Sequence, residues 1–162
     1  VASLAAQACE WAEAAATEKK IAFAHAAPAG PIPVKGDADA LLTVFGNLLA
    51  NAIRYTPEGG QVTVRLGAGD ASAWFEVADT GVGMTEDVKA RVFDKFYRSP
   101  EARGIEAQGL GLGLTLVRQA VAAHHGSVSV ESAPGAGSTF RVTLPLAATD
   151  GDELTDEKGA HD

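Results

Sequence analysis

Two runs of alternating apolar and polar residues constrain the fold most, because they lie close together between helical patterns. The runs are Gln61–Leu66 and Ala73–Ala78, and the glycine-containing stretch Gly67–Ala71 separates them. A period of two is typical of strands that bury one face, and a short connection of this kind joins antiparallel neighbours. The sequence therefore predicts an antiparallel hairpin with one buried face.

Helical patterns lie on both sides of this hairpin. Residues 38–55 repeat apolar side chains at helical spacing, and Asp37 is their predicted N-cap. Residues 3–19 and 112–125 show the same periodicity, and residues 86–92 form a shorter helical stretch. The predicted buried stripes are Leu4, Ala8, Trp11, Ala12 and Ala15 in the first helix, and Leu41, Phe45, Leu48 and Ala52 in the central one.

Three further short runs read as strands, namely Ile21–Ala24, Ser127–Glu131 and Ser138–Leu144, the last two joined by a turn at Pro134–Gly137. Alternation of these elements predicts an α/β (α+β) two-layer sandwich, with one mixed, mostly antiparallel sheet and helices packed on one face.

Length and composition indicate a single folded domain. The chain has 162 residues, of which 46% are hydrophobic, and this is enough for one core. We expect the domain to cover residues 1–147. Residues 148–162 are acidic and lack periodicity, so we expect a disordered tail.

Charge and cysteine content exclude several functions. A net charge of −8 disfavours a general affinity for nucleic acid or acidic membranes. No apolar run reaches the length of about 18 residues that a membrane span requires, so we expect no membrane contact by this chain. The single cysteine, Cys9, allows no disulfide within the chain and no cysteine-based metal site, and we interpret its thiol as a packing group.

The helix predicted over residues 38–55 has a second, polar face. Asn47, Asn51, Arg54 and Tyr55 follow at i, i+4, i+7 and i+8, so they align on one side. Amide oxygens suit a hard cation, a guanidinium suits phosphate and an aromatic ring suits stacking, which makes this face a candidate wall of a nucleotide site. For this segment alone, an ordinary solvated polar face is the more frequent explanation.

A second candidate is the segment Asp79-Thr80-Gly81-Val82-Gly83-Met84. Asp79 shares a strand face with two core positions of the preceding run. A buried carboxylate needs hydrogen-bond donors, which the exocyclic amine of adenine, water or Thr80 could supply, and Gly81 and Gly83 would let the backbone turn close to a flat base. An Asp-Gly turn with a self-capping carboxylate fits the segment equally well.

The third candidate is Gln108-Gly109-Leu110-Gly111-Leu112-Gly113-Leu114, which opens a helix. Alternate glycines at a helix N-terminus expose backbone N–H groups to a phosphate. The segment lacks the lysine of a Walker loop and follows a polar loop, residues 99–109, rather than a strand, which argues against a Rossmann fingerprint. We expect that loop to be mobile.

In this order, the segments resemble the signature boxes of sensor histidine kinases, which belong to the GHKL (Bergerat) superfamily shared with DNA gyrase and a heat-shock chaperone. The resemblance covers residues 1–146. It rests on an N box at Asn47–Pro57, a first glycine box at 79–84, an F box at Phe93–Arg98, a second glycine box at Gly109–Leu114 and a final hairpin at Gly135–Phe140.

The resemblance implies ATP and Mg²⁺ as ligands and assigns roles to the polar residues. Asn51 would coordinate Mg²⁺, Asn47 would contact phosphate or metal-bound water, and Arg54 would contact phosphate; these three are the implied catalytic residues. Tyr55 would stack on adenine and Asp79 would bind the adenine amine. The other implied nucleotide contacts, around an ATP lid at 99–109, are Gly81, Gly83, Met84, Arg98, Gln108, Gly109, Leu110, Gly111, Leu112 and Gly113.

The implied function is a protein-histidine kinase domain that transfers the ATP γ-phosphoryl group to a histidine. In the family this histidine precedes an acidic residue on a dimerisation hairpin, and His25, His124, His125 and His161 all lack that context. We therefore expect the acceptor on a hairpin outside this chain, a response regulator downstream, a cytoplasmic location within a membrane-bound parent, and a monomer when isolated.

Two alternative functions fit the same residues. One is a nucleotide-binding regulatory module without phosphotransfer, and the other is a GHKL-type ATPase. The second is disfavoured by the F box and by Asn47, because hydrolytic relatives carry an acid there. Within the F box, the i, i+3 spacing of Phe93 and Phe96 predicts that both are buried, with Tyr97 at the surface.

Overall fold

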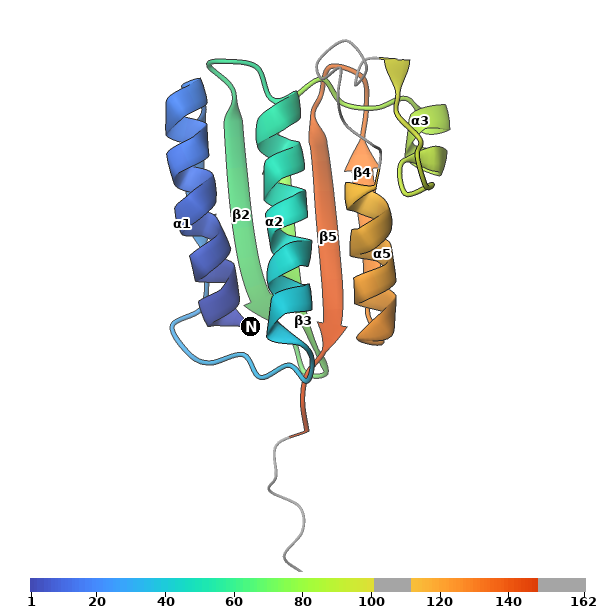
Figure 1. Ribbon diagram of the computed structural model, residues 1–162. Helices are drawn as coiled ribbons and strands as arrows, with labels where there is room; N and C mark the ends of the chain where they lie inside the picture. Colours follow the sequence, from blue (N-terminus) through green and yellow to red (C-terminus); the bar gives the residue numbers. More distant parts are fainter. Residues whose placement is uncertain (101–111, 149–162) are drawn as a thin grey trace, which may run out of the picture.

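The computed structural model describes residues 1–100 and 112–148, and it shows a single sheet covered on one face by helices (Figure 1). Each predicted helix and strand is present, with small differences at the ends. The elements are α1 (Ala2–Lys19), β1 (Ala22–Ala26), α2 (Ala38–Tyr55), β2 (Gln61–Ala68), β3 (Ser72–Asp79), α3 (Glu86–Arg91), α5 (Gly113–Ala123), β4 (Ser127–Ser132) and β5 (Ser138–Pro145).

The sheet has the strand order β1-β2-β3-β5-β4. Only β1 and β2 run parallel, while β2–β3, β3–β5 and β4–β5 are antiparallel. The predicted mixed, mostly antiparallel two-layer sandwich is therefore confirmed. In the β3–β5 register Asp79 lies opposite Ser138, so the last residue of β3 meets the first residue of β5.

The hydrophobic core lies between the sheet and the helical layer. On β3 the buried residues are Ala73, Phe75 and Val77, which alternate with half-buried ones as the period of two predicts. Phe45 of α2 packs against Phe75, with 4.2 Å between the ring centroids. Asp79 continues the buried side of β3, so its carboxylate emerges beneath the helical layer at the edge of this core.

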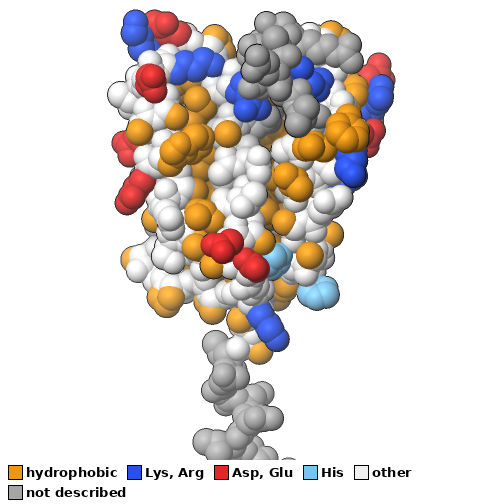
Figure 2. All heavy atoms as spheres, in the orientation of Figure 1, with side chains coloured by type: hydrophobic (Ala, Val, Ile, Leu, Met, Phe, Trp, Pro, Cys, Tyr) orange, Lys and Arg blue, Asp and Glu red, His pale blue; other side chains and the backbone are white. Residues whose placement is uncertain are grey.

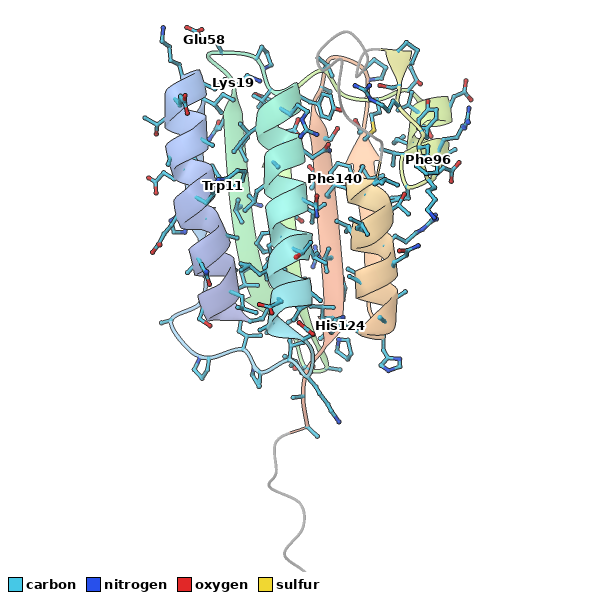
Figure 3. All side chains as sticks on the ribbon, viewed as in Figure 1. Trp11, Lys19, Glu58, Phe96, His124 and Phe140 are labelled. Carbon is cyan, nitrogen blue, oxygen red and sulfur yellow. The ribbon has the colours of Figure 1, made fainter. Side chains whose placement is uncertain are left out.

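The buried stripe predicted for α1 is partly wrong. Trp11 is 53% exposed, on the outer surface of α1 (Figure 3). The fully buried positions of α1 carry only small side chains, and these pack α1 closely against the core. The buried residues of α1 are Ala5, Ala8, Cys9, Ala12 and Ala16. Burial, with a smaller contribution from Glu13, raises the pKa of the Cys9 thiol to about 11, which agrees with a packing role.

The outer surface of the helical layer carries apolar and charged side chains side by side (Figure 2). Its exposed large apolar side chains include Trp11 and Leu116, which lie on separate helices. Among residues 1–100 and 112–148, no helix combines the length and the apolar character needed to cross a membrane.

The predicted N-cap of α2 is confirmed and provides a stability test. Asp37 Oδ1 accepts a hydrogen bond of 2.9 Å from the Ala40 N–H. Asp37→Ala removes this acceptor and should lower the free energy of unfolding by about 1 kcal/mol. Thermal denaturation should show a decrease in Tm of roughly 2–4 °C for a chain of this size. Asp37→Asn retains a good N-cap and serves as the control; equal Tm values for the two variants would contradict this role.

Candidate functional site

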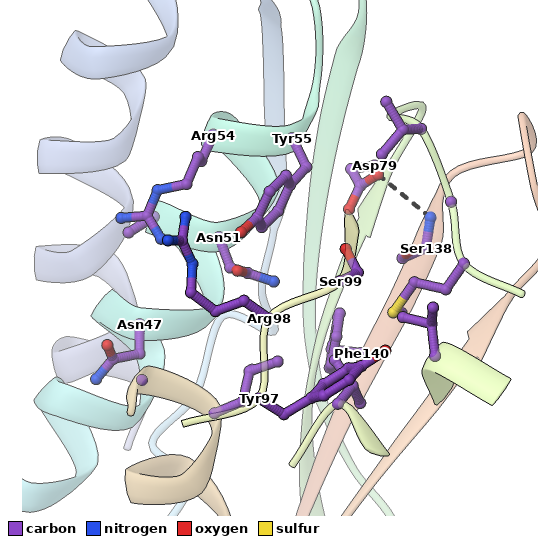
Figure 4. Close-up of a pocket in the computed structure, with 18 residues that line it drawn as sticks. Asn47, Asn51, Arg54, Tyr55, Asp79, Tyr97, Arg98, Ser99, Ser138 and Phe140 are labelled. Atoms are coloured by element: carbon purple, nitrogen blue, oxygen red, sulfur yellow. Dashed lines mark hydrogen bonds between the residues drawn. The ribbon is translucent and has the colours of Figure 1, made fainter. Parts of the chain in front are cut away.

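A pocket lies between the C-terminal half of α2, the adjoining ends of β3 and β5, residues 82–84, α3 and the start of α5 (Figure 4). Its cavity volume is about 140 Å³. A single water molecule needs only about 10–15 Å³, so the pocket admits a small-molecule group. The described lining residues are Asn47, Ala50, Asn51, Arg54, Tyr55, Asp79, Val82, Gly83, Met84, Val88, Val92, Tyr97, Arg98, Ser99, Gly113, Leu114, Ser138 and Phe140.

The polar face of α2 forms one wall of this pocket. Asn47, Asn51, Arg54 and Tyr55 all line it, so the face that the sequence placed on one side of the helix borders a concavity rather than open solvent. The Asn47 amide nitrogen donates a hydrogen bond of 2.9 Å to the carbonyl of Thr43 in the preceding turn. The amide nitrogen is thus engaged by the helix backbone, and the amide oxygen is the atom of Asn47 that can accept a further hydrogen bond.

The first turn of α5 approaches this wall closely. A Cβ atom at Gly113 would lie 3.0 Å from Asn47 Oδ1, so glycine allows the two helices to meet here. Gly113 and Leu114 line the pocket, which directs the N-terminal end of α5 toward it.

Asp79 occupies the opposite side of the pocket. Its Oδ1 accepts hydrogen bonds from the backbone N–H groups of Gly81, at 2.8 Å, and Ser138, at 3.2 Å. Burial raises the pKa of the Asp79 carboxyl, and the two hydrogen bonds oppose that rise. The self-capping Asp-Gly turn is thus present, and the same carboxylate lines the pocket.

The donors to Asp79 differ in part from those expected. The Thr80 hydroxyl, expected as a donor, instead accepts a hydrogen bond of 2.9 Å from the Gln61 N–H. Sequence reasoning missed Ser138, because its place beside Asp79 depends on the register between two strands far apart in the chain.

The two glycines that follow Asp79 allow close contact with protein backbone. A Cβ atom at Gly81 would lie 2.4 Å from the Tyr55 carbonyl oxygen, and one at Gly83 would lie 1.9 Å from that of Ala133. Gly83 also has a positive φ of 69°. Gly83 lines the pocket, whereas Gly81 is not among the lining residues and meets the pocket through its N–H bond to Asp79.

The turn between β4 and β5 holds the loop after Asp79 in place. The Gly135 N–H donates to the Val82 carbonyl at 2.8 Å. On the other side of Gly83, the Met84 N–H donates to Ser132 Oγ at 2.8 Å, and this hydroxyl donates to the Gly137 carbonyl at 2.8 Å. These bonds position the pocket-lining residues 82–84 against the sheet.

A pair of glycine variants tests this contact. Gly83 and Gly135 both have positive φ, of 69° and 74°, but no atom lies within 4 Å of a Cβ at Gly135. Gly135→Ala should cost about 1–2 kcal/mol of unfolding free energy from backbone strain alone. Gly83→Ala should cost a further ~1–3 kcal/mol, since the added methyl group overlaps Ala133. Urea denaturation measures both, and equal losses would contradict the close contact.

Apolar side chains form much of the remaining lining, and Phe93 supports it from outside. The Phe93 ring meets pocket-lining Phe140 edge-on, with 6.1 Å between the centroids. The Thr115 hydroxyl of α5 donates to the Phe93 carbonyl at 3.0 Å. The segment after α3 is therefore attached both to the sheet and to α5.

The predictions for Phe96 and Tyr97 are wrong. Phe96 is 66% exposed, whereas Tyr97 is half-buried and lines the pocket. The Arg91 guanidinium lies 4.4 Å from the centroid of the Tyr97 ring. The helix ends at Arg91 and Phe96 adopts a positive φ of 63°, so the helical i, i+3 spacing does not apply to this segment.

Cationic side chains lie on the α2 side of the pocket. In Figure 4, Arg54 and Arg98 extend beside Asn51, while Asp79 lies on the strand side. Arg98, one of the implied contacts, thus lines the pocket together with Ser99.

The second glycine box is only partly described. Leu112 is the N-cap residue of α5 and does not line the pocket. Gln108, Gly109, Leu110 and Gly111 lie outside the described residues, as do most of the predicted lid at 99–109 and the tail from residue 149 onward.

Comparison with known proteins gives consistent matches. Residues 36–148 match the family model described as histidine kinase-, DNA gyrase B-, and HSP90-like ATPase. The sensor-like histidine kinase SenX3 of Mycolicibacterium smegmatis is 38% identical over 131 residues, which cover 81% of this chain and 34% of the relative. Sensor histidine kinase WalK of Bacillus subtilis is 35% identical over 130 residues, 79% of this chain and 21% of the relative. The chain thus spans about a third or less of these relatives.

Solved structures show the same fold. The mycobacterial sensor histidine kinase MprB has a TM-score of 0.75 and 30% identity, over 89% of this chain and 97% of that one. Full-length ShkA, solved in complex with AMPPNP, has a TM-score of 0.76 and 32% identity, over 91% of this chain and 30% of that one. Both similarities extend over most of the elements that build the pocket.

Proposed function

Because the chain belongs to the histidine kinase-, DNA gyrase B- and HSP90-like ATPase family, and resembles the sensor histidine kinases within it, we propose that it binds Mg-ATP and transfers the γ-phosphoryl group to a histidine. The observation that carries this proposal is that the same pocket has a carboxylate on one side and amides and arginines on the other. A ligand that combines a hydrogen-bond-donating base with an anionic chain matches that arrangement.

The base is best accommodated on the Asp79 side. Both hydrogen bonds to this carboxylate reach Oδ1, so Oδ2 is the oxygen with capacity for the adenine amine. Val82, Met84 and Phe140 provide apolar surface for a ring, and the half-buried Tyr55 provides a face for stacking. Guanine presents a carbonyl at the corresponding ring position, which a carboxylate does not favour.

The phosphates are best accommodated between α2 and α5. Arg54 and Arg98 supply positive charge, and the N-terminal end of α5 adds backbone donors and the favourable end of a helix dipole. Asn47 and Asn51 line the space between these groups.

The described residues also fit a magnesium ion that binds together with the nucleotide. They include no group of three acidic, histidine or cysteine side chains that could hold a metal by themselves. Mg²⁺ commonly retains waters and binds through substrate phosphates plus one or two protein oxygens. The amide oxygen of Asn51 would supply one such ligand, and that of Asn47 would contact a phosphate or a metal-bound water. Bound Mg²⁺ would neutralise phosphate charge.

In the proposed reaction, a neutral imidazole nitrogen attacks the γ-phosphorus. A nitrogen–phosphorus bond forms, the bond between the γ-phosphorus and the bridging oxygen breaks, and ADP leaves with that oxygen. Such a reaction needs positioning and charge neutralisation more than a base on the protein. In this proposal Asp79 holds the adenine ring, and Arg54 and the N-terminal end of α5 hold the phosphates.

The acceptor is proposed to lie on a dimerisation hairpin of the parent kinase. His124 has a structural role, since its Nε2 accepts a hydrogen bond of 3.0 Å from the Asp37 N–H. His25 lies on the edge strand β1, away from the pocket lining. A response regulator downstream, and a cytoplasmic position within a membrane-bound parent, belong to the same proposal.

A hydrolytic function is less well supported. Asp79 is the only carboxylate among the described lining residues, and its Oδ1 is engaged by two backbone N–H groups. Asn47, at the position where hydrolytic relatives carry an acid, cannot remove a proton from water. Transfer to a nucleophile that needs no strong base is therefore favoured.

Phosphotransfer in trans tests the proposal. The chain is mixed with the purified dimerisation hairpin of the parent kinase and with ATP labelled in the γ-phosphate, using a hairpin without the acceptor histidine as the control. Acid-labile label on the intact hairpin alone is the expected result. Nucleotide binding without transfer would instead support the regulatory module, and steady release of phosphate would support an ATPase.

A further inference from the structure

The C-terminal end of α2 is capped by a lysine from α1. Lys19 Nζ donates hydrogen bonds to the carbonyl oxygens of Ile53, at 2.8 Å, and Arg54, at 2.9 Å. Helices leave their last carbonyls without partners in the helix, and a positive charge at this end also interacts favourably with the helix dipole. Figure 3 shows Lys19 at the end of α1 that lies level with the end of α2.

The neighbouring carbonyls of α2 have partners from other segments. The buried Thr56 hydroxyl donates to the Ala52 carbonyl at 2.7 Å. The Val82 N–H, from the loop after Asp79, donates to the Tyr55 carbonyl at 3.3 Å. The last turn of α2 is thus held on one side by the loop that follows Asp79 and on the other by the ammonium of Lys19.

This turn carries side chains of the candidate site. Arg54 and Tyr55 line the pocket and Asn51 lies one turn earlier, whereas Lys19 itself is not a lining residue. Movement of the last turn would shift Arg54 relative to Arg98, and Tyr55 relative to Asp79. A small displacement of groups that act together can greatly reduce binding.

We infer that Lys19 is a positioning residue of the nucleotide site, which holds the last turn of α2 so that Arg54 and Tyr55 meet the nucleotide together. The inference rests on the proposed function, and it assigns a role in binding to a residue of α1, outside the segment of 36–148 that matches the family model.

Lys20 provides a matched control. It follows Lys19 directly and has the same charge, but its Nζ pairs with Glu58 Oε1 at 3.2 Å, and both side chains are largely exposed. Exposed pairs of this kind contribute little to stability. Lys19→Met and Lys20→Met remove the same charge from adjacent positions. Only Lys19→Met also removes the hydrogen bonds to the carbonyls of α2.

Calorimetric titration with Mg-ATP tests the inference, at a temperature where circular dichroism shows each variant fully folded. We expect Lys19→Met to bind about tenfold more weakly than the native chain, in keeping with the loss of charge-assisted hydrogen bonds. Lys20→Met should bind within about twofold of native. Lys19→Arg, which retains a cationic donor, should recover part of the affinity. A purely structural role would lower the melting temperature without changing the affinity of the folded protein.

The outcomes separate the inference from the proposed function. If the native chain binds Mg-ATP and Lys19→Met binds it equally well, the positioning role is wrong while the nucleotide site stands. If the folded native chain does not bind Mg-ATP, the proposed function is wrong and the inference fails with it. Should Lys19→Met not fold, Lys19→Gln is compared with Lys20→Gln under the same expectation.

Discussion

Replacing Asp79 by asparagine is expected to weaken ATP binding by about a hundredfold or more, which corresponds to roughly 2.7 kcal/mol. The asparagine oxygen can still accept the N–H groups of Gly81 and Ser138, so the fold should be retained. The new amide nitrogen, however, would place a donor opposite the adenine amine, and two donors cannot form a hydrogen bond. Calorimetry with ATP measures the loss.

The same variant has a second, selective consequence. The carbonyl of guanine can accept a hydrogen bond from the asparagine nitrogen, so the ratio of ATP affinity to GTP affinity should fall in Asp79→Asn. Circular dichroism provides the control for folding. Unchanged ATP affinity in the folded variant would contradict the assignment of Asp79 to the base.

The pH dependence of stability should change as well. Burial raises the pKa of Asp79 in the folded chain, so the folded state binds this proton more tightly than the unfolded state. The carboxyl's contribution to the free energy of unfolding therefore falls as pH rises from the unfolded value of about 3.9 to the folded pKa, and is then constant. Without ligand, Asp79→Asn should be at least as stable as the native chain at neutral pH, and this advantage should shrink in acid. Marked destabilisation at neutral pH would contradict the burial effect.

The second large effect is expected for Asn51→Ala, which removes the amide proposed to bind Mg²⁺. Binding of ATP by this variant should no longer respond to Mg²⁺, and phosphotransfer to the hairpin should fall by about a hundredfold or more, because charge neutralisation at the phosphates is lost. Alanine favours helix, so α2 should remain intact. Titrations with and without Mg²⁺ measure the effect.

Asn47→Ala is the matched comparison for Asn51. In the native chain the Asn47 amide nitrogen donates to the helix backbone, and the Asn47 amide oxygen lies beside Gly113. We therefore expect Asn47→Ala to reduce the Mg²⁺ dependence of ATP binding less than Asn51→Ala does. An Asn51→Ala variant that keeps the full response to Mg²⁺ would contradict the assignment, whatever the result for Asn47.

The features that sequence predicted well depend on local periodicity. The polar face of α2 follows from helical spacing alone, and the direction of Asp79 follows from the alternation along β3. The sheet and its helical layer follow from the same two periods. The N-cap at Asp37 was predictable because the residue itself supplies the acceptor.

The features that sequence missed depend on tertiary contacts. The Ser138 N–H reaches Asp79 only through the β3–β5 register. A side chain at Gly81 would collide with the backbone of Tyr55, and one at Gly83 with the backbone of Ala133. Trp11 lies on the exposed side of α1, and the contacts of α1 with the core are made by alanines and Cys9. Chain positions far apart determine each of these contacts, so no local pattern could reveal them.

The F box shows a different limitation. The spacing of Phe93 and Phe96 predicts one buried face. Phe96, however, adopts a left-handed backbone conformation and its side chain is exposed to solvent, while Tyr97 lines the pocket. A single residue with positive φ is sufficient to invalidate an argument from helical spacing. Lys19 was missed because its partners are backbone carbonyls, which leave no trace in side-chain patterns.

Calorimetric titration of the native chain with ATP and GTP, each with and without Mg²⁺, tests the central claim most directly. The pocket geometry predicts binding that prefers ATP to GTP and strengthens with Mg²⁺. A folded native chain that binds no adenine nucleotide under any of these conditions would contradict the assignment of the pocket and the kinase function proposed from it.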